Sequence, residues 1–596
     1  MLRINPNPFR PLSKSTSVLL RSITTLEHQS KLDSKMLFSH DRRTKIVATM
    51  GPSSIVRLPE LLMAGINVAR INCAHGDAEQ YAGICKAVRA AEREVRISGS
   101  AHLITHGEGL CGSRRDIAAI AFDVKGPEIR IGRFAADVPF KMINTTLPDG
   151  SIKKVQGNKE IPLSRGDRFI LTTDPKKASE GRKGEVYISY GNICKQVQPG
   201  QVIFVDDGNI ELRVIEVHAD KGELVVESIT SVALSERKNV NLPGLVVDLP
   251  AVTAKDEVDL ATAKRLGADF IFASFVQSAD AVRQIRKITG PDMRIISKIE
   301  SQEGVDNIDA ILRASDGIMV ARGDLGVQIP AERVFLAQKS MIAQANILGK
   351  VVICATQMLD SMVHSPRPTR AEVVDVASAV LDGADAVMLS GETAKGSYPL
   401  EAVQTMSRIC VAAEAAYPSR SFFTALSNHP AVPVGVDDDE SLLYHEIVQV
   451  KNFLEGKSGA EGGEFTDDSE NADFMTVADV ETIGSAAVHA AFETKAVAIV
   501  VASISGRTAS LVAKYRPNCP VICLVSDEAV GRQLMLRRGV HVILMPAEVL
   551  DSANRVRSLA MGFVKDLGIG KKGDRVVLVQ SQGDVPTAAV TLTQVH

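Results

Sequence analysis

Two short stretches of this sequence place charged side chains directly after apolar runs. In RIISKIESQEG, residues 294–304, Lys298 is followed two residues later by Glu300; in GIMVARGDLG, residues 317–326, Arg322 is followed by Asp324. Short apolar runs of this kind are typical of strands, in which residues i and i+2 lie on the same face. Each charged pair is therefore expected to project from one side of a strand end, where it can meet a ligand.

The types of these residues restrict the chemistry. Glu300 and Asp324 on neighbouring strands can share one divalent ion, and two carboxylates suit Mg²⁺ or Mn²⁺ better than zinc. Gly323 lets the backbone approach a ligand closely. A metal surrounded by basic side chains is an arrangement for phosphoryl transfer, in which the protein mainly positions reactants and neutralises charge. The basic residues available for phosphate are Arg70, Lys125, Arg130, Lys298 and Arg322.

The elements that must position these side chains recur along the chain. Eight continuous apolar runs alternate with segments of helical periodicity, which predicts parallel strands buried on both faces and a closed (β/α)₈ TIM barrel. An open doubly wound sheet is the alternative, but no G-x-G-x-x-G motif follows the first run. The predicted strands are 45–51, 66–76, 117–127, 268–276, 293–300, 317–324, 350–357 and 385–392.

The carboxyl ends of these runs carry many polar groups. One or two such residues would be explained by contact with water, whereas a ring of them around the mouth of a barrel predicts an active site. Beyond the two charged pairs, the ring consists of Arg70, Asn72, Asp123, Lys125, Thr356, Ser390 and Glu392.

Composition changes divide the chain into further parts. The predicted catalytic barrel covers 44–126 and 247–418, with a polar loop at 97–116. Residues 127–246 are rich in strand-forming residues and turns, which predicts an inserted all-β lid domain, a small barrel. Residues 419–475 form an acidic, Gly/Ser-rich insertion, predicted to be solvated or disordered. Residues 476–596 predict a C-terminal α/β domain with strands at 496–503, 520–526, 541–545 and 575–580.

Bulk properties exclude several classes of protein. The 596 residues are 45% hydrophobic with a net charge of −3, which favours neither nucleic acid nor a membrane as partner. The eight cysteines are scattered and predict buried thiols rather than a zinc site. Residues 1–43 are basic and serine-rich. They indicate either a disordered extension of a cytoplasmic enzyme or a transit peptide to a mitochondrion or plastid.

Several long motifs resemble the pyruvate kinase family. They include TKIVATMGPSS, NVARINCAHG, DVKGPEIRIG, VNLPGLVVDLPA, SKIES, MVARGDLG and VICATQMLDSM, and the block PRPTRAEVVDVASAVLDGADAVMLSGETAKGSYPLEAV is long and specific. The C-terminal segment SGRTASLVAKYRP belongs to the same pattern. Together the matching stretches lie within 44–418 and 476–596.

The resemblance implies phosphoryl transfer from phosphoenolpyruvate to ADP, giving pyruvate and ATP, by a homotetramer that needs Mg²⁺ (or Mn²⁺) and K⁺. By motif, Lys298 would steady the moving phosphoryl group while Glu300 and Asp324 hold Mg²⁺. The remaining assignments are substrate contacts at Arg70, Gly323 and Thr356, a place near the protonated enolate for Thr356, Ser390 and Glu392, and nucleotide contacts at Asn72, His75, Arg130 and Lys238.

Two departures from the family pattern concern K⁺. The sequence has NCAHG where the family has NFSHG, so Ala74 replaces a serine that usually helps to bind K⁺. It also has DVKGPEIR for DTKGPEIR, where Val124 can still contribute a backbone carbonyl. Asn72 and Asp123 are retained, and Glu128 is the residue type of K⁺-dependent members. We therefore predict activation by K⁺ with weakened affinity.

A second, weaker site is suggested in the C-terminal domain. The motif VASISGRTAS runs from a strand into a helix start, where N–H groups and hydroxyls can cradle a phosphate. Family members use this loop for a sugar-phosphate effector, but an ordinary turn explains it equally well. Ile504 brings no charge, and the chain end lacks a basic loop, which disfavours fructose 1,6-bisphosphate. The candidate residues are Ser503, Ser505, Gly506, Arg507 and Thr508.

Two other functions fit part of this pattern. A Mg²⁺-dependent TIM-barrel lyase or aldolase could use the same carboxylate pair on a pyruvate enolate, but its turnover would ignore ADP. A non-catalytic regulatory homologue is disfavoured because Lys298, Glu300, Asp324 and Thr356 are intact.

Overall fold

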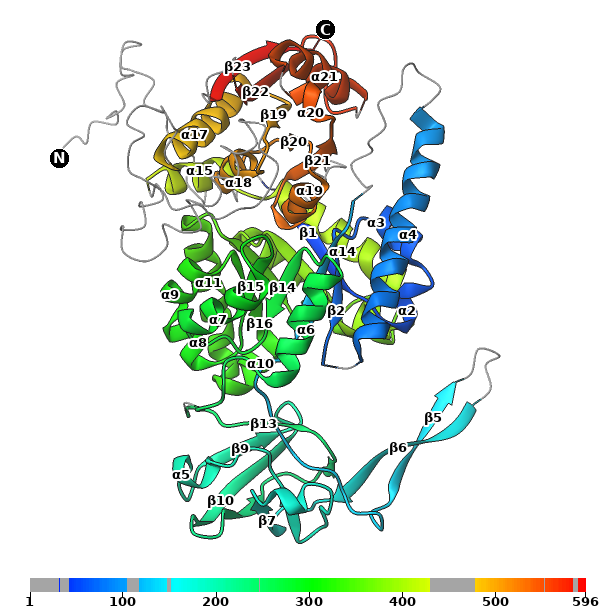
Figure 1. Ribbon diagram of the computed structural model, residues 1–596, viewed down its shortest axis with the longest axis vertical. Helices are drawn as coiled ribbons and strands as arrows, with labels where there is room; N and C mark the ends of the chain where they lie inside the picture. Colours follow the sequence, from blue (N-terminus) through cyan, green and yellow to red (C-terminus); the bar gives the residue numbers. More distant parts are fainter. Residues whose placement is uncertain are drawn as a thin grey trace, which may run out of the picture.

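The structure is a computed structural model in which three parts lie one after another along the long axis (Figure 1). The barrel occupies the middle, the C-terminal domain packs on one end of it, and the β-rich insert hangs from the other. The residues described are 32, 42–74, 76–103, 117–146, 152–245, 247–428, 477–550, 552–566, 568–581 and 588–595. Within these ranges, no helix has the length and apolar character needed to cross a membrane.

Eight parallel strands form the predicted closed barrel, in the order β1-β18-β17-β16-β15-β14-β3-β2. Each of the eight apolar runs supplies one strand, so the fold class is confirmed. The strands are β1 Lys45–Thr49, β2 Val68–Asn72, β3 Ala119–Val124, β14 Phe270–Ala273, β15 Arg294–Ile299, β16 Gly317–Ala321, β17 Val351–Ala355 and β18 Ala386–Leu389.

Helices cover the outside of the barrel. Several begin at side-chain caps that satisfy free backbone N–H groups, such as Thr253, Ser278 and Thr369. The larger helices are α3 Leu58–Ala64, α4 Ala78–Leu103, α6 Ala254–Arg265, α7 Ala279–Thr289, α9 Ile308–Ala314, α11 Val334–Ile347, α12 Arg370–Asp382 and α14 Pro399–Ala415. Short helices follow the strand ends, namely α2 Pro52–Ile55, α8 Gln302–Asp306 and α13 Gly391–Ala394.

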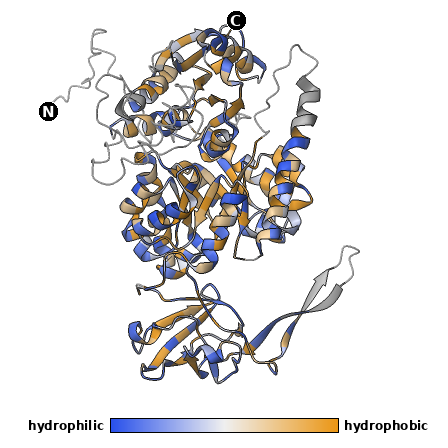
Figure 2. Ribbon diagram, viewed as in Figure 1, coloured by the Kyte–Doolittle hydropathy of each residue, from blue (hydrophilic) through white to orange (hydrophobic). Residues whose placement is uncertain are grey.

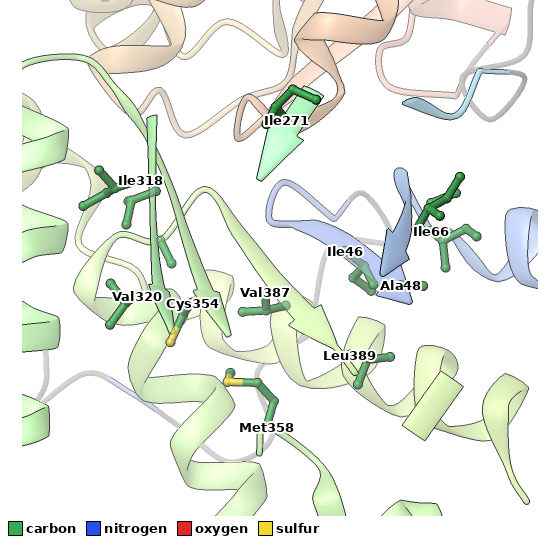
Figure 3. Close-up of a cluster of buried hydrophobic side chains, with 14 of the residues drawn as sticks. Ile46, Ala48, Ile66, Ile271, Ile318, Val320, Cys354, Met358, Val387 and Leu389 are labelled. Carbon is green, nitrogen blue, oxygen red and sulfur yellow. The ribbon is translucent and has the colours of Figure 1, made fainter. Parts of the chain in front are cut away.

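The barrel core lies between the strands and this ring of helices. Alternate strand residues such as Ile46, Ile318 and Val387 point outward into a shared buried cluster, together with Met358 from the turn after β17 (Figure 3). The barrel strands are mostly hydrophobic, whereas many hydrophilic residues lie on the surrounding helices (Figure 2). Burial on both strand faces is the reason why the sequence shows continuous rather than alternating apolar runs.

Two sequence-based boundaries were wrong. Strand β16 ends at Ala321, and Arg322–Gln328 forms helix α10, so Arg322 and Asp324 lie in a helical first turn rather than on a strand. Their side chains therefore diverge, because a two-residue step along a helix is a rotation of about 200°. The predicted polar loop 97–116 begins as helix, since α4 extends to Leu103; residues 104–116 lie outside the described ranges.

The insert between β3 and β14 forms a seven-stranded sheet in the order β4-β13-β9-β10-β11-β7-β8. A bridge between Ile131 and Ile188 joins the two edges, as in the predicted small barrel. The strands are β4 Ile129–Arg130, β7 Arg168–Thr172, β8 Glu185–Tyr187, β9 Val202–Val205, β10 Ile210–His218, β11 Glu223–Ser228 and β13 Asn239–Asn241, with the short helix α5 Ile193–Gln196.

A second sheet extends from the insert as an arm. Its order is β12-β6-β5, and the long β5–β6 hairpin projects away from the rest of the molecule (Figure 1). These strands are β5 Phe140–Thr146, β6 Ile152–Pro162 and β12 Ala233–Ser235. The sequence analysis did not separate this arm from the lid.

The C-terminal domain has a five-stranded sheet in the order β21-β20-β19-β22-β23. The four predicted strands are β19 Ala498–Ala502, β20 Val521–Val525, β21 Val540–Leu544 and β22 Arg575–Ser581; the antiparallel edge strand β23, Ala588–Gln594, was not predicted. The helices are α17 Val477–Thr494, α18 Arg507–Lys514, α19 Glu528–Gln533, α20 Ala547–Leu550 and α21 Ala553–Asp566.

The predicted acidic insertion 419–475 does not begin as a loop. Its first nine residues form helix α15, Ser419–Ser427, whose Leu426 is buried. Its remaining part from 429 onward lies outside the described residues, as does most of 1–43.

Candidate active site

Lys298 lies at the centre of a buried charge cluster at the carboxyl end of β15. Its Nζ is 3.1 Å from Asp123 Oδ1 and 3.0 Å from Glu300 Oε1, and it donates a hydrogen bond to Ser274 Oγ at 2.6 Å. Burial alone would lower the pKa of this ammonium group, but Asp123 and Glu300 outweigh burial and raise the pKa. Lys298 is therefore held as a cation in one position.

The predicted metal-binding carboxylates lie close enough to repel each other. Burial raises the pKa of Asp324 and the Glu300 carboxylate raises it further, to about 7, although Lys298 opposes both. The lid residue Asp207 and the hinge residue Glu128 add to the effect. Negative charge is thus in excess around Asp324, which is the condition that a divalent cation would relieve.

Glu300 and Asp324 have the donor type that a hard divalent cation prefers. Within the described ranges, no group of three or more His, Cys, Asp or Glu side chains is placed to bind one. Two carboxylates leave the remaining positions of an octahedral ion to water and substrate oxygens, which suits Mg²⁺ or Mn²⁺ rather than structural zinc.

Arg70 in the middle of β2 lies beside the same cluster. Its Nε is 2.6 Å from Asp123 Oδ2 and its Nη1 donates to Thr49 Oγ1 at 2.8 Å. Burial opposes ionisation of Asp123, but Arg70 and Lys298 together lower its pKa. Asp123 therefore fixes two cations, a role that the sequence reasoning did not assign to it.

The predicted K⁺ ligands lie on adjacent strands. Asn72 is in register with Asp123, and its Oδ1 accepts the Ala74 N–H at 3.1 Å. Ala74 has no side-chain oxygen, and both Asp123 oxygens already accept hydrogen bonds from cations. The side chains of Asn72 and Asp123 with the Val124 carbonyl fit a monovalent cation less completely than a set that includes a serine hydroxyl.

Thr356 follows β17 in a strained turn. Thr356 has φ +75° and Gln357 has φ +54°, both in the left-handed region that costs about 1 kcal/mol or more for residues other than glycine. Arg322 holds this turn, because its Nη2 donates to the Thr356 carbonyl at 2.8 Å and its Nη1 is 2.6 Å from Asp375. Arg322 is thus not positioned to bind phosphate, contrary to the sequence-based expectation.

The absence of a side chain at Gly323 leaves room for Thr356 as well as for a ligand. A Cβ at Gly323 would lie 2.6 Å from Thr356 Cγ2, closer than side chains pack. The glycine therefore lets α10 and the Thr356 turn meet at the mouth of the barrel.

Ser390 and Glu392 lie at the end of β18, but the Glu392 carboxylate is already engaged. Its Oε1 accepts the Leu359 N–H at 3.1 Å and its Oε2 accepts the Ser390 N–H at 2.7 Å. Burial raises the pKa of this carboxyl group. Glu392 ties the loop after β17 to the loop after β18, which orients Ser390 and Thr356.

The predicted nucleotide contacts on the lid are paired with acidic partners. Arg130 Nη2 is 2.7 Å from Glu128 Oε2, and Lys238 Nζ is 2.5 Å from Asp206 Oδ1. Lys125 Nζ is 3.6 Å from the same Glu128 oxygen. His75 lies outside the described residues.

The candidate effector loop has its hydroxyls turned inward. Ser503 Oγ accepts the Gly506 N–H at 3.0 Å, and Ser505 Oγ accepts the Arg507 N–H at 3.4 Å. Gly506 has φ +76° and precedes α18, which begins at Arg507 and continues with Thr508. These contacts are those of a closed strand-to-helix turn, so an effector role stays a prediction.

Sequence reasoning missed three residues that support the site. Ser274 donates to Asp123 at 3.2 Å while accepting from Lys298. Phe275 has φ +54° and donates its N–H to Glu300 Oε2 at 2.7 Å. Asp207 on the lid lies near enough to Asp324 to raise its pKa. The end of the fourth apolar run, FASF, held the signal for the first two, because a buried strand ends there on a serine.

Comparisons with known proteins agree with this geometry. Models of the pyruvate kinase barrel domain match residues 41–149 and 142–403, and a model of the pyruvate kinase alpha/beta domain matches 481–591. The chain is 41% identical over 552 residues to the pyruvate kinase of Leishmania mexicana, covering 91% of this chain and 94% of that protein.

The chain belongs to the pyruvate kinase family.

Relatives with the same name come from distant organisms. Pyruvate kinase 1 of Saccharomyces cerevisiae is 38% identical over 550 residues, covering 90% of this chain and 93% of the yeast protein. The pyruvate kinase of Agaricus bisporus is 40% identical over 512 residues, covering 85% of this chain and 81% of its own length. The similarity thus extends across the barrel, the lid and the C-terminal domain of a pyruvate kinase.

Proposed function

We propose that the protein transfers the phosphoryl group of phosphoenolpyruvate to ADP, giving pyruvate and ATP. As a pyruvate kinase family member it is a phosphotransferase. The observation that carries the assignment of residues is the buried Lys298 cation beside the mutually repelling carboxylates Glu300 and Asp324. Phosphoryl transfer needs this combination of a fixed cation and a divalent-metal site.

The chain's own residues position the phosphoryl group. Lys298, held by Asp123, Glu300 and Ser274, would donate hydrogen bonds to the oxygens of the group in transit. Arg70, fixed by Asp123 and Thr49, would contact the phosphate from the adjacent strand. Mg²⁺ or Mn²⁺ held by Glu300 and Asp324 would neutralise charge on the phosphate oxygens.

The other side of the substrate would meet the strained Thr356 turn and Gly323. Thr356 is proposed to lie near the enolate as it is protonated, with Ser390 on the neighbouring loop that Glu392 ties in place. Glu392 acts here as a positioning residue, because both its oxygens are engaged by backbone N–H groups.

The lid would bring the nucleotide side of the site. Arg130, Lys238, Asn72 and His75 are proposed to contact ADP, with Arg130 and Lys238 exchanging Glu128 and Asp206 for phosphate oxygens. Closure of the lid would exclude water, which strengthens every charge interaction in the site. K⁺ is proposed to bind at Asn72, Asp123 and Val124.

The assembly is proposed to be a homotetramer. Phe335 and Leu336 on α11 and Val374 on α12 are 55%, 56% and 64% exposed on the barrel surface. Three large apolar side chains on adjacent helices suit burial against another subunit. Size-exclusion chromatography with light scattering tests this proposal, and a monomer at working concentration would contradict it.

One assay tests the proposed reaction. Pyruvate formation from phosphoenolpyruvate is measured with and without ADP, Mg²⁺ and K⁺, with ATP quantified in parallel. We expect pyruvate and ATP in equal amounts only when ADP and Mg²⁺ are both present. Pyruvate formation independent of ADP would favour a lyase, and the absence of pyruvate under every condition would favour a non-catalytic homologue.

A further inference from the structure

The loop after β2, residues 73–76, is held at both ends by side chains to which no role has yet been assigned. At its start, Lys255 Nζ donates a hydrogen bond to the Cys73 carbonyl at 2.7 Å. At its end, the Tyr81 hydroxyl lies 3.0 Å from the Gly76 carbonyl, and it is also 3.2 Å from the Cys73 carbonyl. The backbone of this loop is therefore fixed by two donors that come from different helices, α4 and α6.

The same loop belongs to the cation and nucleotide side of the proposed site. Asn72 directly precedes it, and Ala74 and His75 lie within it. The Cys73 N–H donates to the Asp123 carbonyl at 2.9 Å, and the Ala74 N–H donates to Asn72 Oδ1 at 3.1 Å. The course of the loop backbone thus sets where the Asn72 side chain lies relative to Asp123.

The two donors serve different carbonyls. A tyrosine hydroxyl has one proton, so Tyr81 cannot donate a full hydrogen bond to both carbonyls at once. Because Lys255 satisfies the Cys73 carbonyl, the Tyr81 proton is left for Gly76. Burial raises the pKa of Tyr81, so its hydroxyl stays protonated and remains a donor at neutral pH. Loss of either side chain would leave one end of the loop without its donor.

The ring of Tyr81 is itself rigidly placed. It is only 2% exposed and makes an edge-to-face contact with Phe122 of β3, with ring centroids 5.7 Å apart and planes at 82°. Gly76 has φ +105°, and a Cβ there would lie 3.1 Å from Tyr81 Cε1 and 2.6 Å from Gln80 Oε1. The end of the loop therefore packs directly against the Tyr81 ring.

Lys255 lies in the first turn of α6, which also contacts the next strand-end loop. Asp256 is 2% exposed, and its Oδ1 accepts the Gly126 N–H in the loop after β3 at 3.0 Å. Lys255 Nζ is 2.5 Å from Asp259 Oδ2. Since this carboxylate balances its charge, Lys255 acts on the loop mainly as a hydrogen-bond donor. The start of α6 thus holds the two loops that adjoin the proposed K⁺ ligands.

We propose that Tyr81 and Lys255 are positioning residues that hold the loop after β2 in the conformation that binds a monovalent cation and the nucleotide. They act through the carbonyls of Cys73 and Gly76. Loss of either donor lets the loop shift, so the Asn72 oxygen no longer converges with those of the neighbouring strand. The effect on activity rests on the proposed function, whereas the hold on the loop does not.

Hydrogen–deuterium exchange of the full chain without substrates tests the hold on the loop. Tyr81→Phe removes the hydroxyl and leaves the ring against Phe122, and Lys255→Met removes the ammonium group from a chain of similar length. In each variant, peptides spanning 73–81 are expected to exchange about three- to tenfold faster, because a hydrogen bond of ordinary strength is lost. Unchanged exchange in one variant would remove that residue from the proposal, and unchanged exchange in both would overturn it.

Tyr515→Phe is the matched control. Tyr515 is also 2% exposed, and its hydroxyl donates to Glu481 Oε1 at 2.9 Å in the C-terminal domain. This variant should lower Tm but leave the exchange of 73–81 unchanged. Equal acceleration in all three variants would show general destabilisation instead of positioning. Lys255→Met keeps the test open if Tyr81→Phe folds poorly, because the Lys255 side chain is 42% exposed.

Kinetics test the link from the loop to the site. In Tyr81→Phe and Lys255→Met, the K⁺ concentration for half-maximal activity should rise about three- to tenfold and the KM for ADP at least about twofold. The KM for phosphoenolpyruvate should stay within about twofold, because Arg70 and Lys298 are held by other partners. Lys255→Arg keeps a donor and should restore both altered constants.

The two measurements fail in different ways. Faster exchange with unchanged constants for K⁺ and ADP would overturn the coupling of the loop to the site. Absence of the proposed reaction would leave the exchange result intact, so it would contradict the proposed function and not the hold on the loop.

Discussion

Partly buried aspartates with opposite electrostatics lie next to the two ends of strand β16. Asp316 directly precedes the strand, and its partner Arg294 contacts Gln533 of the C-terminal domain. Asp324 follows the strand in α10, which lies at the lid end of the barrel (Figure 1). Burial opposes ionisation of both. Arg286 and Arg294 nevertheless lower the pKa of Asp316 to about 2, whereas Glu300 adds to burial and raises the pKa of Asp324 to about 7.

The difference separates structural charge from functional charge. Asp316 accepts hydrogen bonds from the Ile295 N–H at 2.7 Å and from Arg286, and Lys350 nearby donates to the Ser315 carbonyl at 2.8 Å. These partners compensate each other within the fold. At the lid end the carboxylates exceed the cations, so the site is complete only with a ligand. An excess of carboxylates over cations, rather than burial of charge, therefore distinguishes the lid end of the barrel.

The largest expected effect contrasts the buried Lys298 with the partly buried Lys350, which directly precedes β17. Lys298→Met should lower kcat for pyruvate formation by about 10²–10³-fold or more, because a fixed donor to the phosphoryl group is lost. Lys350→Met should leave kcat within about threefold and lower Tm instead, since its partner is a backbone carbonyl. Steady-state assays and thermal unfolding on both variants check this contrast. A Lys298→Met enzyme with normal kcat would remove the basis for the proposed site.

Asp324 and Asp316 should differ in the same way: loss of Asp324 should mainly lower activity, and loss of Asp316 should mainly lower stability. Asp324→Asn is expected to lower kcat at least about 100-fold at saturating Mg²⁺ while keeping or raising Tm, because it relieves repulsion with Glu300. Asp316→Asn should keep most of the activity but destabilise the protein by about 3 kcal/mol, since two arginines lose their counter-charge. Equal losses of Tm in both variants would contradict the comparison.

Low pH should remove the contribution of Asp316 to the free energy of unfolding. A carboxylate with a lowered folded-state pKa stabilises the fold above its unfolded value of about 3.9, and this contribution is lost as the pH falls towards about 2. The Tm difference between wild type and Asp316→Asn should thus be constant from pH 7 to about pH 5 and shrink below about pH 4. A difference independent of pH down to the acid unfolding range would show that the charge of Asp316 is not what stabilises it.

Two serines around Lys298 provide a smaller, sharper test. Ser274→Ala should reduce kcat about tenfold with little change in Tm, because Ser274 fixes the Lys298 ammonium at 2.6 Å. Ser297→Ala is the matched control. Among the described residues, the Ser297 hydroxyl is hydrogen-bonded to Ser315 Oγ at 2.6 Å and not to Lys298. A loss of equal size in both variants would assign Ser274 to stability rather than to positioning.

The smallest effect is a gain. Ala74→Ser restores a hydroxyl beside Asn72 and Asp123 and should lower the K⁺ concentration for half-maximal activity by about three- to tenfold. Titration of activity with KCl at constant ionic strength measures it, with Ala74→Gly as the variant that adds no oxygen. Full wild-type activity without K⁺ would contradict the proposed cation site.

Much of the barrel could be predicted because its strands are buried on both faces. Continuous apolar runs such as 350–357 leave no other element type once eight of them alternate with helical segments. Strand β23 was missed because one face of this edge strand stays exposed, as Leu592 does at 47%, and its sequence shows a weaker signal.

The candidate site was predicted in its residue types but not in all its geometry. The contact between Lys298 and Glu300 follows from strand periodicity, and the structure has it. The prediction for Arg322 was wrong because β16 ends three residues before the predicted strand 317–324 does, and the helix that follows turns its guanidinium towards Asp375. The Asp123–Ser274 contact joins residues 151 positions apart, and no local pattern announces such a pair.

The attachment of the lid has a consequence for how the enzyme can be rebuilt. Strands β3 and β14 are neighbours in the barrel although the whole insert separates them in sequence, and the chain enters and leaves the lid through the paired strands β4 and β13. The ring of eight strands is therefore closed without the lid, and the lid is an insertion in the single loop between β3 and β14. Deleting the lid beyond the paired strands β4 and β13 should yield a folded enzyme with an uncovered active site. That enzyme should still bind phosphoenolpyruvate.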